Sequence, residues 1–214
     1  MKQHYQRRLD EIIDNQGKKV PALLLHSCCA PCSSYVLEYL SQYFSITVFY
    51  YNPNIYPEEE YRKRVWEQQE FISRLEVKHP VTFMEGEFDP QEFYKMAAGM
   101  EECGERGERC YHCYRLRLSK TAETAGRQGF DYFCTTLSVS PLKNAEWLNE
   151  IGEEQSVVHG VEWLPSDFKK REGYKRSIEL SREYGLYRQD YCGCIFSKKQ
   201  RETEKKQNNT CHGK

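Results

Sequence analysis

Short apolar runs alternate with longer segments of helical periodicity along this chain of 214 residues. An apolar run without polar alternation predicts a strand that is buried on both faces, as in a parallel sheet. Apolar residues that recur every three or four positions predict a helix. We predict strands at residues 21–26, 46–51, 81–85, 130–136 and 161–164, and helices after residue 31, at 57–75, 90–98, 110–127 and 174–184, and from Pro141 onward with Ser140 as its N-cap.

Strands that alternate with helices predict an α/β fold with a parallel sheet and right-handed crossovers. We expect a single domain over residues 21–196, an N-terminal extension over residues 1–20 and a basic, disordered tail over residues 197–214. Ligands of such sheets bind beyond the carboxyl ends of the strands. The turns after the first, second and fourth strands, at residues 26–34, 52–57 and 135–144, should therefore share one rim of the sheet.

The charge of the chain is informative only locally, because 31 basic and 32 acidic residues leave a net charge of −1. Basic residues gather at 169–176 and 197–206, densely enough to follow a phosphate backbone. A solvated surface and a frayed terminus explain the same clusters equally well. The charged N-terminus lacks the apolar segment of a signal peptide, and no apolar run is long enough to span a bilayer, so we expect a cytoplasmic protein without a membrane partner.

Ten cysteines are unusual in a chain of this kind, because the expected compartment keeps thiols reduced. Metal binding or redox chemistry is a better explanation than a framework of disulfides. Seven of the cysteines fall into three groups, and three stand alone. The groups are Cys28, Cys29 and Cys32, then Cys110 and Cys113, then Cys192 and Cys194; the single residues are Cys103, Cys134 and Cys211.

Cys110 and Cys113 lie on one face at the start of a predicted helix, so both sulfurs can reach one metal ion. A zinc half-site and a thioredoxin-like redox pair share this spacing. Seven cysteines exceed the four of a structural zinc site, and iron–sulfur clusters also take four cysteines from closely spaced groups. A site of Cys28, Cys29, Cys110 and Cys113 is geometrically plausible, which leaves Cys32, Cys192 and Cys194 for a second metal or a thiol pair.

The single cysteines carry less information. Cys134 lies within a predicted strand, where a buried thiol usually serves packing. Cys211 is expected to be an exposed residue without a role, and Cys103 is left unassigned. We therefore expect no metal ligand among these three.

Six segments together resemble the QueH-type epoxyqueuosine reductases, which act at the end of queuosine biosynthesis in bacterial tRNA. The segments cover nearly the whole predicted domain but neither the first twenty residues nor the tail after Ser197. The combination of these segments is highly specific for this family. They read HSCCAPC (residues 26–32), YNPNIYPEEEYRKR (51–64), CYHCYRLRL (110–118), TTLSVSPLKN (135–144), DFKKREGYKRS (167–177) and LYRQDYCGC (186–194).

The resemblance implies a Rossmann-like fold related to nucleotide α-hydrolases, with a 4Fe-4S cluster and a nearby second metal, iron or zinc. The implied reaction is a two-electron reduction of the epoxide of epoxyqueuosine, at the wobble position of the anticodon, to queuosine. The turn after the first strand carries cysteines where adenylating relatives have an S-G-G-x-D-S loop. No dinucleotide motif is present, so an external protein is the expected electron donor.

Several residues of the matched segments are candidates for the chemistry that the resemblance implies. As catalytic residues we expect Cys32, Asp167 and Tyr191. Asp167 and Tyr191 are expected to donate protons or to bind the diol of the substrate. As substrate-binding residues we expect Tyr51 and Asn52, and at phosphates of the tRNA anticodon stem-loop Arg62, Arg64, Lys169, Lys170 and Arg171. Arg115 and Arg117 are weaker candidates, because a helix beside an anionic cluster also favours cations. The alternatives are a thiol-disulfide oxidoreductase and a zinc-stabilised RNA-binding module.

Overall fold

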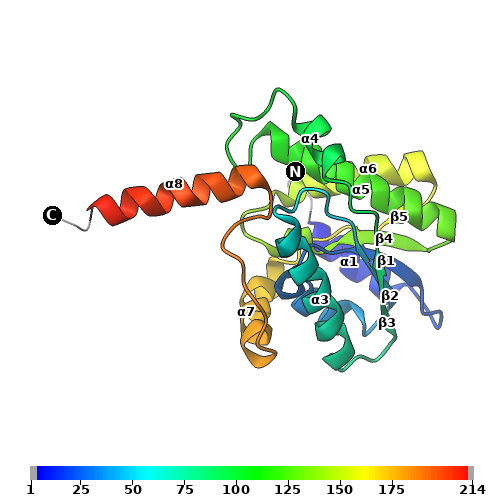
Figure 1. The fold of residues 1–214 in the computed structure, drawn as a ribbon. Coiled ribbons are helices and arrows are strands. Elements are labelled where there is room, and N and C mark those ends of the chain that lie inside the picture. Colours follow the sequence, from blue (N-terminus) through cyan, green and yellow to red (C-terminus); the bar gives the residue numbers. More distant parts are fainter. Residues whose placement is uncertain (1–3, 212–214) are drawn as a thin grey trace.

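A computed structural model describes residues 4–211 of the backbone and the side chains of residues 4–207. Its centre is a five-stranded parallel sheet with the strand order β3-β2-β1-β4-β5 (Figure 1). This α/β arrangement is Rossmann-like, as the alternation of apolar runs predicts. The strands are β1 (Ala22–His26), β2 (Ser45–Tyr50), β3 (Val81–Glu85), β4 (Tyr132–Thr135) and β5 (Glu162–Trp163).

Helices cover both faces of the sheet. In Figure 1, α4, α5 and α6 lie above the sheet, and α3 and α7 lie below it. Within the described residues, no helix combines the length and apolarity that a bilayer crossing requires. The helices are α1 (Tyr5–Asp14), α2 (Ala30–Leu40), α3 (Glu58–Arg74), α4 (Pro90–Ala97), α5 (Glu108–Gln128), α6 (Ala145–His159), α7 (Gly173–Glu183) and α8 (Ile195–Cys211), with 3-10 turns η1 (Thr136–Val139) and η2 (Lys170–Glu172).

The central strand β1 is fully buried from Leu23 to His26, because neighbours flank it on both edges and helices cover both faces. Leu25 lies opposite Val48 of β2 on one side and Cys134 of β4 on the other, and all three side chains are inaccessible to solvent. From β1 the chain adds β2 and β3 on one side of the sheet and then returns to add β4 and β5 on the other side, so the order of the strands reverses between β1 and β4. Ligands of open α/β sheets bind at this switch point, so the sheet places a site where these two strands end.

Two boundaries differ from the sequence expectations. The helix expected from Pro141 begins at Ala145, because Asn144, not Ser140, caps it by accepting from the backbone N–H groups of Glu146 and Trp147 at 3.0 and 3.3 Å. The expected N-terminal extension contains α1, whose Leu9 is fully buried against the core. Its apolar stripe is narrow among charged residues, which is why composition alone did not reveal a helix.

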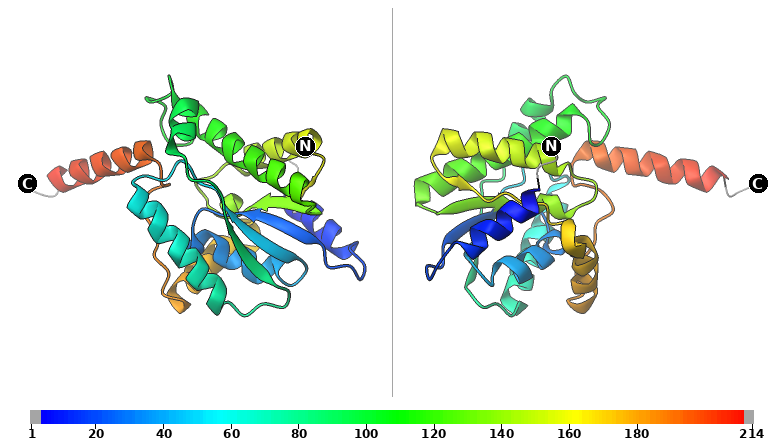
Figure 2. Two further views of the ribbon diagram at one scale, coloured as in Figure 1. Left: turned by 45° about the vertical axis from the view of Figure 1, so that its right-hand side comes forward. Right: turned by 180° about the vertical axis from the view of Figure 1, so that it is seen from behind.

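The expected disordered tail is helical in the structure as far as Cys211. Helix α8 projects from the body of the molecule in every view (Figures 1 and 2). Glu204 accepts hydrogen bonds from Gln200 at 3.1 Å and from Arg201 at 2.7 Å, which are contacts between successive turns of a helix. A composition rich in Lys, Gln, Arg and Glu suits a solvated helix as well as a disordered tail, so composition could not separate the two.

Candidate active site

The site begins where β1 ends. His26 is fully buried; its Nδ1 lies 2.9 Å from Oγ1 of Thr135 and its Nε2 lies 3.2 Å from the carbonyl oxygen of Tyr51. This ring therefore ties the carboxyl ends of β1, β4 and β2 together. Burial lowers the pKa of His26 to about 3, so the imidazole is neutral at physiological pH. The three turns share one rim of the sheet, as the sequence predicts.

A group of three thiols follows directly after His26. The sulfur atoms of Cys28, Cys29 and Cys32 lie within 4.8 Å of one another, and this group could bind a metal ion. Cys29 is the residue before the first turn of α2, and Cys32 lies within that turn. Hydrogen bonds from Cys28 and Cys32, with the charge of Arg64 nearby, hold the pKa of the Cys29 thiol well below its usual range. The turn thus favours a thiolate at its centre.

Four further thiols gather at the start of α5. Cys110, Cys113, Cys192 and Cys194 line one narrow cavity; Cys113 and Cys194 are buried and the other two are half-buried. The chain between Cys192 and Cys194 turns at Gly193, which has a φ of 123°. A Cβ at this glycine would also lie 3.2 Å from Nη1 of Arg64. Glycine is therefore required for the turn that presents both cysteines to α5.

Arg117 separates the two thiol groups. It lines the narrow cavity and also the large cavity that Cys28 and Cys32 border, and only 1% of the residue is exposed. Its Nε donates to the carbonyl oxygen of Cys113 at 3.1 Å, whereas its Nη2 has no hydrogen-bond partner among the described residues. A buried guanidinium with an unpaired nitrogen is costly unless an anionic group lies beside it.

A second buried cation lies on the other side of Cys192. The Nζ of Lys143 is 2.8 Å from the sulfur of Cys192 and 3.6 Å from Oε1 of Glu105, and Lys143 is 8% exposed. Thiolates and inorganic sulfide are anionic, so a thiolate-bound metal centre meets the electrostatic demand of both Lys143 and Arg117. The donor set therefore fits a metal that prefers sulfur ligands.

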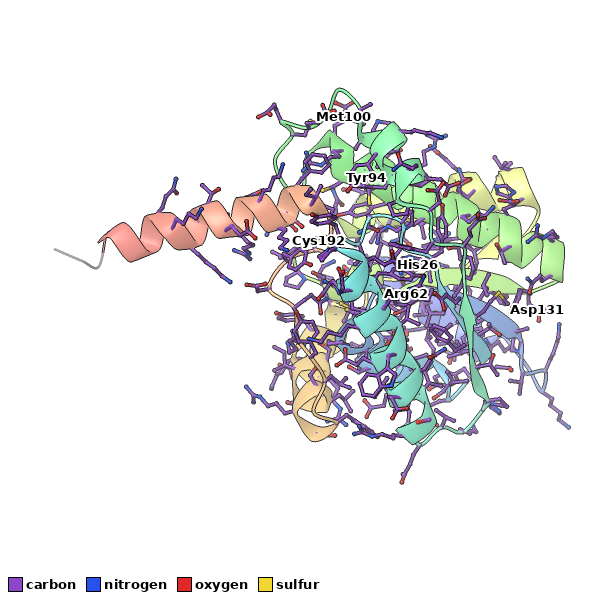
Figure 3. All side chains as sticks on the ribbon, in the orientation of Figure 1. His26, Arg62, Tyr94, Met100, Asp131 and Cys192 are labelled. Atoms are coloured by element: carbon purple, nitrogen blue, oxygen red, sulfur yellow. The ribbon has the colours of Figure 1, made fainter. Side chains whose placement is uncertain are left out.

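The large cavity, so named in contrast to the narrow one, lies beside Cys28 and Cys32 and has a volume of about 450 Å³. Leu137, Val139 and Pro141 form an apolar wall, and Arg188, Tyr191 and Cys192 lie in the loop before α8. Figure 3 shows Cys192 at the base of α8 and Asp131, which precedes β4, at the far side of the molecule. The cavity is thus at the carboxyl ends of the strands and large enough for a single nucleobase with its substituent.

The seven clustered cysteines lie in two groups. Cys32 lies with Cys28 and Cys29, and Cys192 and Cys194 line one cavity with Cys110 and Cys113. The expected four-cysteine site of Cys28, Cys29, Cys110 and Cys113 stays a prediction. The path of the last loop brings Cys192 and Cys194 to α5. A hydrogen bond of 2.8 Å from the backbone N–H of Tyr56 to the carbonyl oxygen of Gly193 ties that loop to the segment before α3.

Of the expected catalytic residues, two line the large cavity. These are Cys32 and Tyr191, whose hydroxyl donates to the carbonyl oxygen of Tyr56 at 2.8 Å. Asp167 lies in a different cavity, of about 810 Å³, where its Oδ1 is 3.0 Å from Nζ of Lys169. Asp167 therefore pairs with a lysine there and does not line the large cavity.

The expected substrate-binding residues are dispersed. Asn52 is fully buried and donates to the carbonyl oxygen of Ser27 at 2.8 Å, so it supports the cysteine turn. The hydroxyl of Tyr51 donates to Glu92, and both residues line a fourth cavity. Arg62 is exposed and forms an ion pair with Glu85 at 3.0 Å. None of these three side chains lines the large cavity.

The basic triplet borders the same cavity as Asp167. Lys169 donates to the carbonyl oxygens of Ser138 and Lys143 at 3.2 and 3.4 Å, so it braces the turn after β4. Lys170 is exposed, and Arg171 forms an ion pair with Asp10 of α1 at 2.5 Å. This cavity adjoins the large one through Lys143, which lines both.

Among the buried cations, sequence reasoning missed Lys143 and expected Arg64 and Arg117 at phosphates of the tRNA, whereas both arginines are buried beside the thiols. Arg117 lies one helical turn after Cys113, and that spacing was a usable signal for a cation facing the thiols. Arg64, which is fully buried on α3, and Lys143 carry no such local signal. Cys134 is buried, and its sulfur lies 3.2 Å from the carbonyl oxygen of Leu164, which agrees with packing. The side chain of Cys211 lies outside the described residues.

Comparison with known proteins agrees with this geometry. Residues 23–200 match the sequence profile of the family described as Epoxyqueuosine reductase QueH. The QueH protein of Streptococcus pyogenes serotype M1 is 45% identical over 181 residues, which is 84% of this chain and 71% of that protein. The QueH protein of Staphylococcus epidermidis is 42% identical over 201 residues, which is 91% of this chain and 84% of that protein. The QueH protein of Thermotoga maritima is 34% identical over 181 residues, which is 82% of this chain and 89% of that protein.

Proposed function

This chain belongs to the epoxyqueuosine reductase QueH family, and from this membership we propose that it reduces the epoxide of epoxyqueuosine in tRNA to the alkene of queuosine. The epoxide oxygen leaves as water, so each turnover consumes two electrons and two protons. The substrate base lies at the wobble position of the anticodon. An external protein supplies the electrons.

We assign the four thiols of Cys110, Cys113, Cys192 and Cys194 to a 4Fe-4S cluster. Two closely spaced pairs of cysteines are the usual ligand set of such a cluster, and two buried cations lie against them. The three thiols of Cys28, Cys29 and Cys32 are assigned to a single iron or zinc ion. Three protein ligands leave one coordination position open, as in catalytic metal sites, and two of these ligands border the large cavity.

The metal centres, when bound, supply electrons and a Lewis acid for the epoxide oxygen. The residues of the chain orient the substrate. The apolar wall of Leu137, Val139 and Pro141 excludes water from one side of the base. Burial raises the pKa of Tyr191 to about 12, so its hydroxyl stays protonated at the cavity wall, where its oxygen can accept a hydrogen bond from the diol of the substrate.

The observation that carries the proposal is the position of the two thiol groups on either side of Arg117, with one group open to a cavity of nucleobase size. The same geometry disfavours a thiol-disulfide oxidoreductase. Burial raises the pKa of the Cys113 thiol to about 12 and also raises that of Cys110. The attacking cysteine of a redox C-x-x-C pair needs a lowered pKa, so neither thiol of this pair is prepared for thiol-disulfide exchange. A metal ion, in contrast, displaces the proton of a buried thiol when it binds.

The decisive experiment purifies the protein without oxygen and measures iron, acid-labile sulfide and turnover. The substrate is tRNA that carries epoxyqueuosine, dithionite serves as the reductant, and mass spectrometry of the digested tRNA detects queuosine. We expect a brown protein with absorption near 400 nm, more than four irons per chain if the single ion is iron, and loss of the oxygen atom from the nucleoside. A colourless protein that contains only zinc and leaves epoxyqueuosine intact would contradict the proposal.

A further inference from the structure

Helix α8 leaves the body of the molecule beside the large cavity and projects outward (Figures 1 and 2). Its base is fixed. The ring of Phe196 lies 6.1 Å from that of Phe93, and the guanidinium of Arg109 lies 4.2 Å from the centroid of Phe196. Arg201 donates to the carbonyl oxygen of Asp190 at 2.9 Å. The first turns of α8 therefore hold a set orientation relative to the cavity.

The side chains of α8 are charged asymmetrically. At 3.6 residues per turn, the five basic residues among positions 195–207 fall on about half of the circumference of the helix. They outnumber the two acidic residues: Glu202 falls within the same half of the circumference, and Glu204 pairs with Arg201. This side of α8 therefore carries a net positive charge. The five basic residues are Lys198, Lys199, Arg201, Lys205 and Lys206.

The positive side of α8 reaches the mouth of the large cavity. Arg201 and Lys205 line that cavity, together with Arg188 of the preceding loop. Arg201 pairs there with Glu204, and Lys205 pairs with Asp190. A volume of about 450 Å³ admits one nucleobase, so the sugar-phosphate backbone on either side of that base must remain outside. Residues 198–206 span about 12 Å of helix, which matches about three phosphates of one strand.

We propose that α8 is an RNA-binding arm that contacts the phosphates flanking the nucleotide held in the cavity. This inference rests on the proposed function, because it assumes that the substrate is a base within RNA. The exposed part of α8 argues for RNA over a protein partner. The apolar side chains Ile195 and Phe196 lie at its base, and the later turns present polar and charged groups, whereas protein interfaces need an apolar centre.

The arm is largely separate from the part of the chain that the family profile covers. That profile ends at residue 200, in the second turn of α8, whereas Lys205 and Lys206 lie beyond it. The proposed arm therefore adds affinity for RNA to a catalytic domain whose metal-binding residues all precede α8.

The test compares two triple variants that lower the net charge equally. The first, Lys199→Gln with Lys205→Gln and Lys206→Gln, removes exposed charges of α8. The matched control, Lys18→Gln with Lys78→Gln and Arg127→Gln, removes exposed charges from segments that precede β1, β3 and β4, at the opposite rim of the sheet. Fluorescence anisotropy with a labelled anticodon stem-loop RNA measures affinity at several salt concentrations, and circular dichroism verifies that both variants fold.

We expect the α8 variant to bind this RNA at least about tenfold more weakly near 0.1 M salt, and the slope of log K against log salt to become shallower by about 1 for each lysine that contacts a phosphate. KM for tRNA should rise accordingly. The control variant should bind within twofold of the wild type. Equal losses in both variants would show a general charge effect and overturn the proposal, as would unchanged RNA affinity.

A protein partner would give a different pattern. If the α8 variant bound RNA normally but lost turnover only with a protein electron donor, and not with dithionite, α8 would be a docking site for that donor and the proposal would be wrong. The proposed function fails separately, if the wild type leaves epoxyqueuosine unreduced. In that case the binding comparison alone still supports or overturns the RNA-binding arm.

Discussion

At the scale of single residues, the electrostatic environment of each cysteine depends on which buried cation lies beside its sulfur. Arg117 and Lys143 are buried next to cysteines from three separate segments, and neither cation is satisfied by a carboxylate alone. Such cations stabilise thiolates and anionic clusters, because the low dielectric of the interior strengthens their attraction. The assignment of each cysteine therefore has consequences that substitutions can separate.

Replacement of one cysteine from each thiol group should give different phenotypes. Cys192→Ser should lose the absorption near 400 nm and most of the iron and sulfide, because it removes a ligand of the proposed cluster. Cys32→Ser should retain the cluster and lose turnover, because it removes a ligand of the open metal site. Iron, sulfide and queuosine assays measure both.

Cys134→Ala is the matched control for these substitutions. Its thiol is buried in the sheet away from both groups, so metal content should be unchanged and the free energy of unfolding should fall by about 1 kcal/mol. Retention of the cluster in Cys192→Ser would favour the grouping of Cys28 and Cys29 with Cys110 and Cys113. Loss of the cluster in Cys32→Ser would contradict both assignments, because neither makes Cys32 a ligand of the cluster.

Arg117→Met should shift the reduction potential of the cluster to a more negative value. Reduction adds negative charge, and the buried guanidinium stabilises that charge. Redox titration followed by absorption or electron paramagnetic resonance measures the shift. Arg115→Met is the control, since Arg115 lies on the same helix, is half exposed and pairs with Glu154 at 3.6 Å. Equal potentials in the wild type and Arg117→Met would remove Arg117 from the electrostatic environment of the cluster.

At the scale of elements, the parallel sheet positions the site by aligning the ends of β1, β2 and β4. The opposite rim is held by Asp131, which accepts from the backbone N–H of Ala22 at 2.8 Å and from Nζ of Lys19 at 2.5 Å. These contacts tie the start of β1 to the start of β4. They keep the two strands between which the sheet order reverses in register.

Asp131 should make stability depend on pH in the acid range. The hydrogen bonds from Lys19 and Ala22 lower its pKa below the usual 3.8, so its folded form favours the charged carboxylate. The stabilisation is present above pH 3.8 and is lost as the pH falls through the lower, folded-state pKa. We expect Asp131→Asn to be less stable by about 1 kcal/mol at pH 7, with the difference disappearing near pH 2. Urea unfolding at several pH values measures this, and a constant difference would contradict it.

At the scale of the whole molecule, the proposed cluster cross-links α5 to the loop that carries α8. Cys110 and Cys113 belong to α5, whereas Cys192 and Cys194 directly precede α8. A metal centre bound only by the folded state stabilises the contacts that assemble it. The orientation of α8, and with it the mouth of the large cavity, should therefore depend on the cluster.

Removal of the metals should loosen a defined part of the chain. After treatment with a chelator and an oxidant, we expect a lower melting temperature and faster amide hydrogen exchange at residues 99–113 and 184–207. The sheet, including the buried strand β1, should keep its protection because its core does not involve the metals. Mass-spectrometric hydrogen exchange measures this pattern, and uniform loss of protection would show that the cluster stabilises the fold as a whole.

Local patterns in the sequence determined the strands, most helices, the shared rim and the three short groups into which seven cysteines fall. These features depend on neighbouring residues, because strand burial, helix periodicity and short chelating spacings are local properties. The cap at Asn144 and the helices α1 and α8 were missed, because a turn or a narrow apolar stripe carries little signal in a charged sequence.

The tertiary structure alone decided how the cysteines are grouped and which cations face them. The loop of Gly193 crosses from α7 to lie against α5, so Cys192 joins residues about eighty positions earlier in the chain. Contacts at such separation depend on how whole elements pack, and no local spacing encodes them. For the same reason Asp167, which lies in a segment rich in charged residues, pairs with Lys169 outside the large cavity, while Arg117 occupies the position between the two thiol groups.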